Sequence, residues 1–502
     1  MAEVYDISTA FELQREDMQL TEDLMGGTKA MVRAGESYLP KAEGESSVEW
    51  RRRVSRTVLF NAYKKTVRFC RGQVFQKPVA ISDPDKGSPV TSEQLVWYRS
   101  FSEDVDKQGH NLTVWSGSTF EDGINAGVTF CLVDYSRVET RDTEGGREYL
   151  DNDGEWKPLT RAVEDEKEWS PYFVHVRAKQ VIDCQTEWHG GKAVVSHFRY
   201  VEDVDVTSEE WAQTRIQRIR CFWPGRYQTY ENSQDGGTDF ELVSEGELRD
   251  TQGNILPIVP VAWFMPGEPR TLVTAEPAMQ DLAELNKRHW QATSDQYEMM
   301  EFVRRPVWLG RGMGNDPDNE IQFGAGRLIC TSLPEADLFS RGVDAGSVEA
   351  GRQELQDLES QMALFGLQLL QPKTGTITAT EAARDTQESN STLQGWALSF
   401  QDFLENCLKL VALWRGEEDG PSVVVNTDFA KPIDKSFLLE VYRAGALSKT
   451  ALLEQVKKAG DLSDDLDIQA ELDQQAQELS MSRAGSSSGG LSRLLSTATG
   501  TA

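Results

Sequence analysis

The sequence predicts an α+β protein in which a β-rich region precedes a pair of long helices with a small β-containing insert between them. Three observations predict this class. Short alternating apolar segments, separated by clusters of Gly, Asp and Asn, occupy residues 79–270. Two long stretches with helical apolar spacing follow, at Glu276–Val303 and Val348–Leu370. A longer helical stretch then opens at Thr378–Glu381, where the spacing of Thr and Glu matches a capping box.

Length and charge limit the possible functions. The chain has 502 residues, 81 acidic and 52 basic side chains, and a formal charge of −29. This length predicts several folding units, and an apolar content of 39% excludes wholesale disorder. Because phosphates repel an acidic surface, tight general binding of DNA is not expected. No apolar run is long enough to span a membrane, and the six scattered cysteines predict reduced thiols in a cytosolic protein.

Residues 1–78 are predicted to be helical, with one helix over Ser55–Gln73. Nine cations lie between Arg51 and Lys77, and no acid lies among them. Two interpretations stay open: a solvated helix face, or a surface that pairs with an acidic neighbour in a subunit contact. The candidate contact residues on this basic helix are Arg52, Arg56, Lys64 and Arg68.

The region that follows is predicted to be mostly β. Its alternating segments include Val128–Tyr135, Ala193–Tyr200 and Arg215–Phe222. The segment Asn254–Phe264 is expected to be extended, because its prolines cannot continue a helix. Hairpin turns are expected at the Gly- and Asp-rich clusters between the segments.

The two long helices are predicted to pack against each other. Pro277 stands in the first turn of the first helix, where a missing N–H costs nothing. Its apolar seam is interrupted by His289 and Gln296, which favours oblique packing over a regular coiled coil. The insert is expected to form strands at Pro306–Leu309 and Arg327–Cys330. The candidate packing residues of the two helices are Leu282, Leu285, Leu355, Leu358 and Met362.

The last part of the chain is predicted to be helical and then disordered. A loop at Gln371–Ile377 leads into the third long helix, which continues to Trp414. A short strand is expected at Ser422–Val425, followed by short helices. In the final stretch, Ala484–Ala502, 15 of 19 residues are Ala, Gly, Ser or Thr, a composition typical of disorder.

No catalytic template fits the sequence, and no catalytic residue, metal or cofactor is predicted. The glycines of Gly310–Gly314 do not lead into a helix, so a dinucleotide site is not expected. Walker and nucleophile-elbow motifs are absent from the sequence. A glycosidase-type carboxylate pair in the β region remains an alternative. The nearest approach to a metal cluster matches no known spacing and consists of His175, Cys184, His189 and His197.

The order of these elements resembles that of the portal proteins of tailed double-stranded DNA bacteriophages. Three segments are similar to one portal-like family long described only as of unknown function, and their order and spacing carry the resemblance. These segments are Tyr38–Lys41 with Arg51–Lys77, Asp281–His289, and Gln361–Gly366 with Thr378–Ala382.

The resemblance implies a division of the chain into the named parts of a portal subunit. The wing, with mixed α and β structure, is followed by paired stem helices around a clip, then by a channel loop, a long wing helix and a helical crown. The implied ranges are 1–275 (wing), 276–303 (first stem helix), 304–346 (clip), 347–370 (second stem helix), 371–378 (channel loop), 379–434 (long wing helix and strand), 435–480 (crown) and 481–502 (disordered tail).

The same resemblance implies a non-enzymatic function. About a dozen copies, expected as a homododecamer, would form a ring at one capsid vertex of the virion after assembly in the host cytoplasm. Expected partners are the large terminase subunit, head-completion and tail adaptor proteins, the major capsid and scaffolding proteins, and double-stranded DNA that passes without tight binding. A soluble hydrolase, or another ring-forming adaptor or scaffold of the virion, is the alternative. The residues implied to face DNA in the channel loop are Gln371, Pro372, Lys373 and Thr374.

Overall fold

The computed structural model describes most of the chain as far as residue 427 and shorter pieces beyond it. The chain divides into two compact units, Met1–Thr427 and Asp428–Ala502. The described residues are 3–82, 90–136, 140–143, 146–151, 154–160, 163, 167, 169–209, 212–232, 239–304, 307–311, 335, 337–341, 345–367, 379–427, 429, 439–440, 442–445, 447–458, 468–472 and 474.

The N-terminal region is helical, as predicted, but its basic segment is not one helix. The expected single helix over Ser55–Gln73 is wrong, because the chain leaves the helical conformation at Thr57. Asn61 then accepts a hydrogen bond from the backbone N–H of Lys64 and so begins a new helix. The helices of this region are α1 (Thr9–Gly26), α2 (Thr28–Ala34), η1 (Gly35–Ser37), α3 (Ser47–Arg56) and α4 (Ala62–Val74).

The region predicted to be mostly β begins with two helices, α5 (Ser92–Phe101) and α6 (Leu112–Ala126). Asn111 caps α6 through the backbone N–H of Val114, a start signal that the strand prediction overlooked. Antiparallel sheets follow. One has the strand order β12-β2-β6, a larger one β11-β10-β9-β8-β7, and a third β3-β4-β5.

The bounds of the strands agree with most of the predicted segments. The strands up to the first long helix are β1 (Ala80–Ile81), β2 (Thr129–Tyr135), β3 (Thr140–Thr143), β4 (Gly146–Leu150), β5 (Trp156–Pro158), β6 (Pro171–Arg177), β7 (Val181–His189), β8 (Lys192–Glu209), β9 (Ala212–Trp223), β10 (Arg226–Asn232), β11 (Phe240–Glu247), β12 (Val261–Phe264), β13 (Glu268–Pro269) and β14 (Ala275–Glu276), with the short helix η2 (Ala178–Gln180) before β7.

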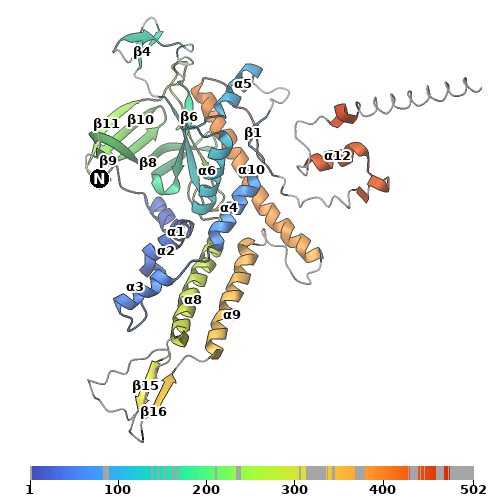
Figure 1. The fold of residues 1–502 in the computed structure, drawn as a ribbon. Coiled ribbons are helices and arrows are strands. Elements are labelled where there is room, and N and C mark those ends of the chain that lie inside the picture. The colour runs from blue at the N-terminus through green and yellow to red at the C-terminus, as the bar shows by residue number, and fades with distance from the viewer. Residues whose placement is uncertain are drawn as a thin grey trace, which may run out of the picture. The chain divides into compact units, whose positions relative to one another are not determined.

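Three long helices follow the sheets, so the mixed α+β class is confirmed. α8 (Gln280–Arg304) and α9 (Ala345–Met362) overlap the first two predicted long helices, and α9 ends in a π-helical turn, η3 (Ala363–Leu367). The predicted start at Glu276 is wrong, because Glu276 belongs to β14 and Pro277 precedes the first turn of α8. α10 (Ala379–Trp414) is the third. Figure 1 shows α8 and α9 side by side.

The insert between α8 and α9 contains an antiparallel pair of strands, β15 (Val307–Arg311) and β16 (Asp337–Arg341). β15 falls on the first predicted strand. Its partner is a segment that the sequence analysis did not single out, and the predicted strand Arg327–Cys330 lies outside the described residues.

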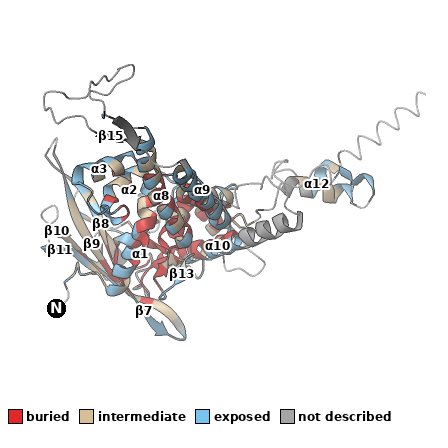
Figure 2. Ribbon diagram, turned by 90° about the horizontal axis from the view of Figure 1, so that it is seen from below, coloured by how far each residue is buried: buried red, intermediate tan, exposed pale blue. Residues whose placement is uncertain are grey.

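An aromatic core joins α4, α6, α10 and the sheet β12-β2-β6. The rings of Phe120 and Phe264 stack at 5.5 Å between centroids, and Phe400 meets both edge-on. Phe75 at the end of α4 also contacts Phe400. Figure 2 shows the buried residues gathered around α8 and α10. This shared core makes α10 part of the same unit as the sheets.

The second long-range connection is the pairing of β1 with β17 (Val423–Val424), which brings Ala80 opposite Val424. In the second unit, the described helix α12 (Lys449–Lys458) falls within the range predicted to be a helical crown. The predicted disordered tail lies outside the described residues.

Gly127 fixes the junction between α6 and β2, and we expect Gly127→Ala to lower the free energy of unfolding by more than about 2 kcal/mol. Its φ is +84°, and an added Cβ would lie 2.5 Å from the carbonyl oxygens of Ala275 and Glu276. The left-handed conformation alone costs an alanine roughly 1–2 kcal/mol, and here backbone must also shift. Urea unfolding measures the loss.

A matched control is Gly253→Ala. Gly253 has a φ of +92°, but nothing lies within 4 Å of the added Cβ. This variant therefore reports the conformational strain without the clash. Equal losses in the two variants would contradict the importance of the close approach at Gly127.

Candidate functional site

The α8–α9 pair is an antiparallel hairpin. Gln296 of α8 donates a hydrogen bond to the carbonyl oxygen of Val348 at the start of α9, with an N–O distance of 3.1 Å. Nearer the start of α8, Arg288 forms an ion pair with Glu354 at 2.9 Å. Because later residues of α9 meet earlier residues of α8, the end of α8 and the start of α9 lie together. The β15–β16 pair is connected to these two ends.

The two polar residues that interrupt the predicted seam of α8 both face α9. Besides its bond to Val348, Gln296 has an Oε1 atom that lies 2.1 Å from the position of a Cβ added at Gly351, so only glycine permits this approach. His289 is buried, its Nε2 atom is 3.5 Å from Glu359, and its ring contacts Phe60. Burial lowers the pKa of His289, although Glu359 opposes the shift. The imidazole is therefore neutral at pH 7 in the helix interface.

The predicted packing residues of the hairpin differ in burial. Leu282, Leu358 and Met362 are buried, whereas Leu285 and Leu355 are half-buried. All five belong to α8 or α9, and the buried residues Leu358 and Met362, one turn apart on α9, are consistent with an apolar seam. The contribution of each of the five to the packing of the two helices stays a prediction.

A different face of α8 holds the N-terminal helical region through polar side chains. Asn286 is fully buried; its Oδ1 accepts the backbone N–H of Tyr63 and its Nδ2 donates to the carbonyl oxygen of Phe60, both at 2.9 Å. One turn later, the indole N–H of Trp290 donates to the carbonyl oxygen of Thr57. Two side chains of α8 thereby form hydrogen bonds with backbone groups that the break between α3 and α4 leaves without helical partners.

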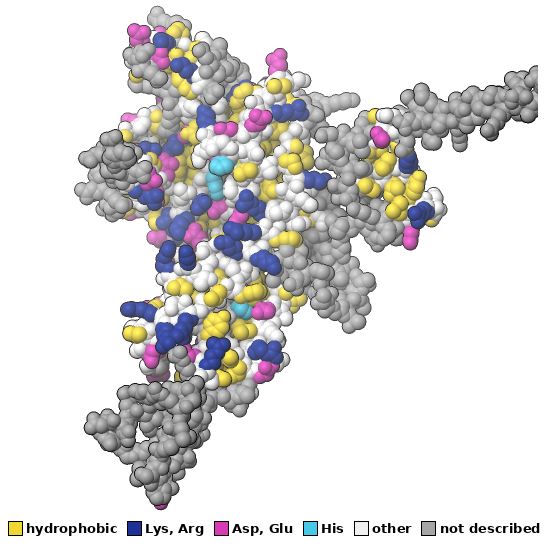
Figure 3. Space-filling model, viewed as in Figure 1, with side chains coloured by type: hydrophobic (Ala, Val, Ile, Leu, Met, Phe, Trp, Pro, Cys, Tyr) yellow, Lys and Arg dark blue, Asp and Glu magenta, His cyan; other side chains and the backbone are white. Residues whose placement is uncertain are grey.

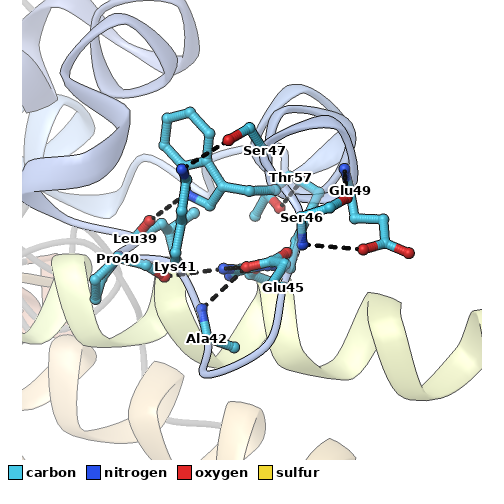
Figure 4. A network of polar contacts seen from close by, with 12 residues as sticks. Leu39, Pro40, Lys41, Ala42, Glu45, Ser46, Ser47, Glu49 and Thr57 are labelled. Atoms are coloured by element: carbon cyan, nitrogen blue, oxygen red, sulfur yellow. Dashed lines mark hydrogen bonds and ion pairs between the residues drawn. The ribbon is translucent and has the colours of Figure 1, made fainter.

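Arg53 completes this attachment from the side of α3. Its guanidinium binds both carboxylate oxygens of Glu45, at 2.9 and 2.8 Å, and also reaches the carbonyl oxygen of Pro40 and Oγ of Ser294 on α8. Figure 4 shows the network around Glu45 and Pro40 beside the ribbon of α8. The hydrogen bond from Arg53 lowers the pKa of Glu45, so this carboxylate stays charged.

The same loop is supported by local bonds. Ser46 and Glu49 form a reciprocal capping box at the start of α3, and the indole of Trp50 donates to the carbonyl oxygen of Leu39. Lys41 donates to Ser47. These contacts hold α3 in a fixed position relative to α8.

The four predicted subunit-contact cations all have partners within the chain. Arg52 and Arg56 both pair with Glu301 of α8, and Arg68 lies 3.8 Å from Glu121 of α6. Lys64 donates to the carbonyl oxygen of Met25 at the end of α1. Lys64 therefore stabilises the end of α1, whereas the three arginines remain largely exposed. Figure 3 shows Lys and Arg side chains on the surface over α3, α8 and α9.

The residues that attach α8 to the N-terminal region were not predicted from the sequence. An apolar stripe marks a buried helix face, whereas this stripe is polar or mixed. The available signal was the spacing of Asn286, Trp290 and Ser294, each one turn apart on the same face of a helix. Gln291, beside them, donates to the carbonyl oxygen of Tyr38 at 2.7 Å.

Other predicted sites have the following outcomes. The channel-loop residues Gln371, Pro372, Lys373 and Thr374 lie outside the described residues. Within the described part of the chain, no group of three or more His, Cys, Asp or Glu side chains is placed to hold a metal ion. Among the helices described, none combines the length and apolar character needed to cross a membrane. The described cysteines are free and buried; they are Cys70, Cys131, Cys184, Cys221 and Cys407.

The fold and the hairpin define a class: an α+β chain whose long helices form an antiparallel hairpin around a small β insert. The family model described as Domain of unknown function (DUF4055) matches residues 278–415, which contain α8, α9 and α10. No curated protein matches the chain.

Similar solved structures come from particles of the gene transfer agent (GTA). A chain from the neck of an empty GTA particle, computed with C6 symmetry, has a TM-score of 0.42 and 12% identity over 85% of this chain and 99% of that chain. A chain from the virion of native GTA has a TM-score of 0.41 and 11% identity over 86% and 93% of the two chains. A chain from the native neck, computed with C12 symmetry, has a TM-score of 0.39 and 11% identity over the same shares.

Proposed function

We propose that this chain is a portal-type subunit that forms a homo-oligomeric ring, expected as a dodecamer, at one capsid vertex. The observation that carries the proposal is the antiparallel hairpin of α8 and α9, whose paired ends lead into the β15–β16 insert and which is followed by the longer helix α10. This is the order of stem, clip, stem and wing helix that the sequence resemblance implies. Polar contacts between α8 and α9 hold the hairpin together along its length.

The proposed roles of the parts follow from this assignment. The insert between α8 and α9 would meet the large terminase subunit during packaging and the head-completion and tail adaptor proteins afterwards. The outer parts of the ring would meet the major capsid and scaffolding proteins. The segment 371–378, with Lys373 as its one cation, would face the DNA. ATP hydrolysis is assigned to the terminase, because this sequence contains no nucleotide-binding motif.

The charge of the chain suits a channel that conducts DNA. A formal charge of −29 per subunit gives a ring an acidic field, which repels phosphates and disfavours binding through counterion release. DNA would then pass without being held. The rings would be located at the portal vertex of the virion, and in the host cytoplasm during assembly.

Imaging of the purified full chain by electron microscopy, together with native mass measurement, tests the proposal. We expect closed rings with an axial hole and a mass that is a whole multiple of the subunit mass of 56.3 kDa. A monomer or small oligomer without a hole would contradict the portal function and favour the alternative of a soluble hydrolase. A ring that fails to bind terminase but binds tail proteins would favour the virion adaptor instead.

A further inference from the structure

The flanks of α8 are occupied by α3 on one side and α9 on the other. The residues of α8 that meet α3 or the segment after it are Asn286, Trp290, Ser294 and Glu301. The residues that meet α9 are Arg288, His289 and Gln296. At about 100° per residue the two sets fall on opposite sides of the helix. Both views agree with this order (Figure 1 and Figure 2).

The outer face of α3 is basic. Arg53 points toward α8 and Val54 is buried, whereas Val48, Arg51 and Arg52 are exposed, although Arg52 also pairs with Glu301 of α8. Arg51 has no ion pair within the described part of the chain, and the pairs of Arg52 and Arg56 both use the one carboxylate of Glu301. One acid on this helix, Glu49, is engaged in the capping box. The face therefore has unneutralised positive charge beside an exposed valine.

The outer face of α9 is acidic. The helix carries four carboxylates against one cation, Arg352, which pairs with Glu349; two of the four, Glu354 and Glu359, meet α8. Asp357 is exposed and has no ion pair among the residues that the structure describes. Asp357 is turned about 100° around the helix from its buried neighbour Leu358, and Leu364, 57% exposed, follows Asp357 by seven residues on nearly the same side. The carboxylates of α9 are Glu349, Glu354, Asp357 and Glu359.

We infer that the outer face of α3 docks on the outer face of α9 of a second copy of this chain, with Arg51 and Arg52 facing Glu349 and Asp357. Two different surfaces of opposite charge on opposite flanks of one subunit make a head-to-tail contact, which generates a ring when the rotation closes. Charge complementarity fixes which flank meets which, and Val48 and Leu364 add apolar area at the contact. The inference rests on the proposed function and names the surfaces that join its subunits.

Charge reversal in the full chain tests the contact. One variant carries R51E/R52E, a second carries E349K/D357K, and a third carries all four changes. We expect each two-site variant alone to lose rings by about tenfold or more, because like charges then face each other at every contact. A 1:1 mixture of the first two variants should restore rings, since each reversed face meets its complement in an alternating order. The four-site variant should also assemble.

The measurements are the ring fraction by size-exclusion chromatography and electron microscopy. The matched control is R177E/K179E, which makes the same charge change at exposed residues of the β6–β7 connection and should leave the ring fraction within twofold of the native value. Circular dichroism should show native helix content in every variant. If the native chain forms rings and the two-site variants do so equally well, or the mixture fails to assemble, the inference is wrong while the portal proposal stands. If the native chain forms no ring, both fail.

Discussion

Replacing Asp134 by alanine should lower the free energy of unfolding by about 3–5 kcal/mol, because it leaves a buried arginine without its counter-charge. Asp134 at the end of β2 accepts a hydrogen bond from Arg220 of β9 at 2.6 Å and another from Tyr172. The two charged side chains are 2% and 11% exposed. Burial disfavours the charged guanidinium, but Tyr200 and Asp134 raise the pKa of Arg220 above its ordinary value. Because a guanidinium does not lose its proton in proteins, Arg220 stays charged when its partner is removed.

This ion pair joins the sheet β12-β2-β6 to the five-stranded sheet, so its loss should destabilise the whole first unit. Chemical unfolding of dilute subunits, followed by tryptophan fluorescence, measures the effect. The control is the double variant Asp134→Leu with Arg220→Met, which removes both charges and should recover most of the stability. A double variant as unstable as Asp134→Ala would contradict the account, since the cost would then not come from an unpaired charge.

Asn286→Ala should lower the free energy of unfolding by about 2–5 kcal/mol. The substitution leaves the N–H of Tyr63 and one bond to the carbonyl oxygen of Phe60 unmade in a buried environment, and each unsatisfied buried group costs about 1–3 kcal/mol. The same side chain fixes the break between α3 and α4 on α8. We therefore expect α3 to loosen before the rest of the unit unfolds, with faster amide hydrogen exchange in residues 47–61 than in α10.

Gln291→Ala provides the comparison for this prediction. Gln291 lies on the same helix and makes one bond, to the carbonyl oxygen of Tyr38, at a half-buried position. Its loss should cost about 1 kcal/mol. Similar effects in the two variants, or unchanged exchange in α3 of the Asn286 variant, would show that the buried amide does not hold the two helices together.

Local patterns determined the elements of the fold. The apolar spacing of Glu276–Val303 and Val348–Leu370 predicted α8 and α9 because a helix that buries one face must repeat apolar residues every three or four positions. Alternation predicted β2, β8 and β9 for the corresponding reason in strands. The break at Thr57 escaped notice because a cap by Asn61 is a single side chain within a continuous run of helix-forming residues.

The tertiary structure alone decided what the charged and polar residues do. The sequence showed a cluster of cations at Arg51–Lys77 but not that Arg53 would bind Glu45 and Ser294 while Arg51 stayed exposed, since the partners lie up to 241 positions away. Hydrophobic burial depends on periodicity, which can be read along the chain. The pairing of charges depends on which segments meet in space. Only the tertiary structure therefore shows that α8 lies between the basic helix α3 and the acidic helix α9.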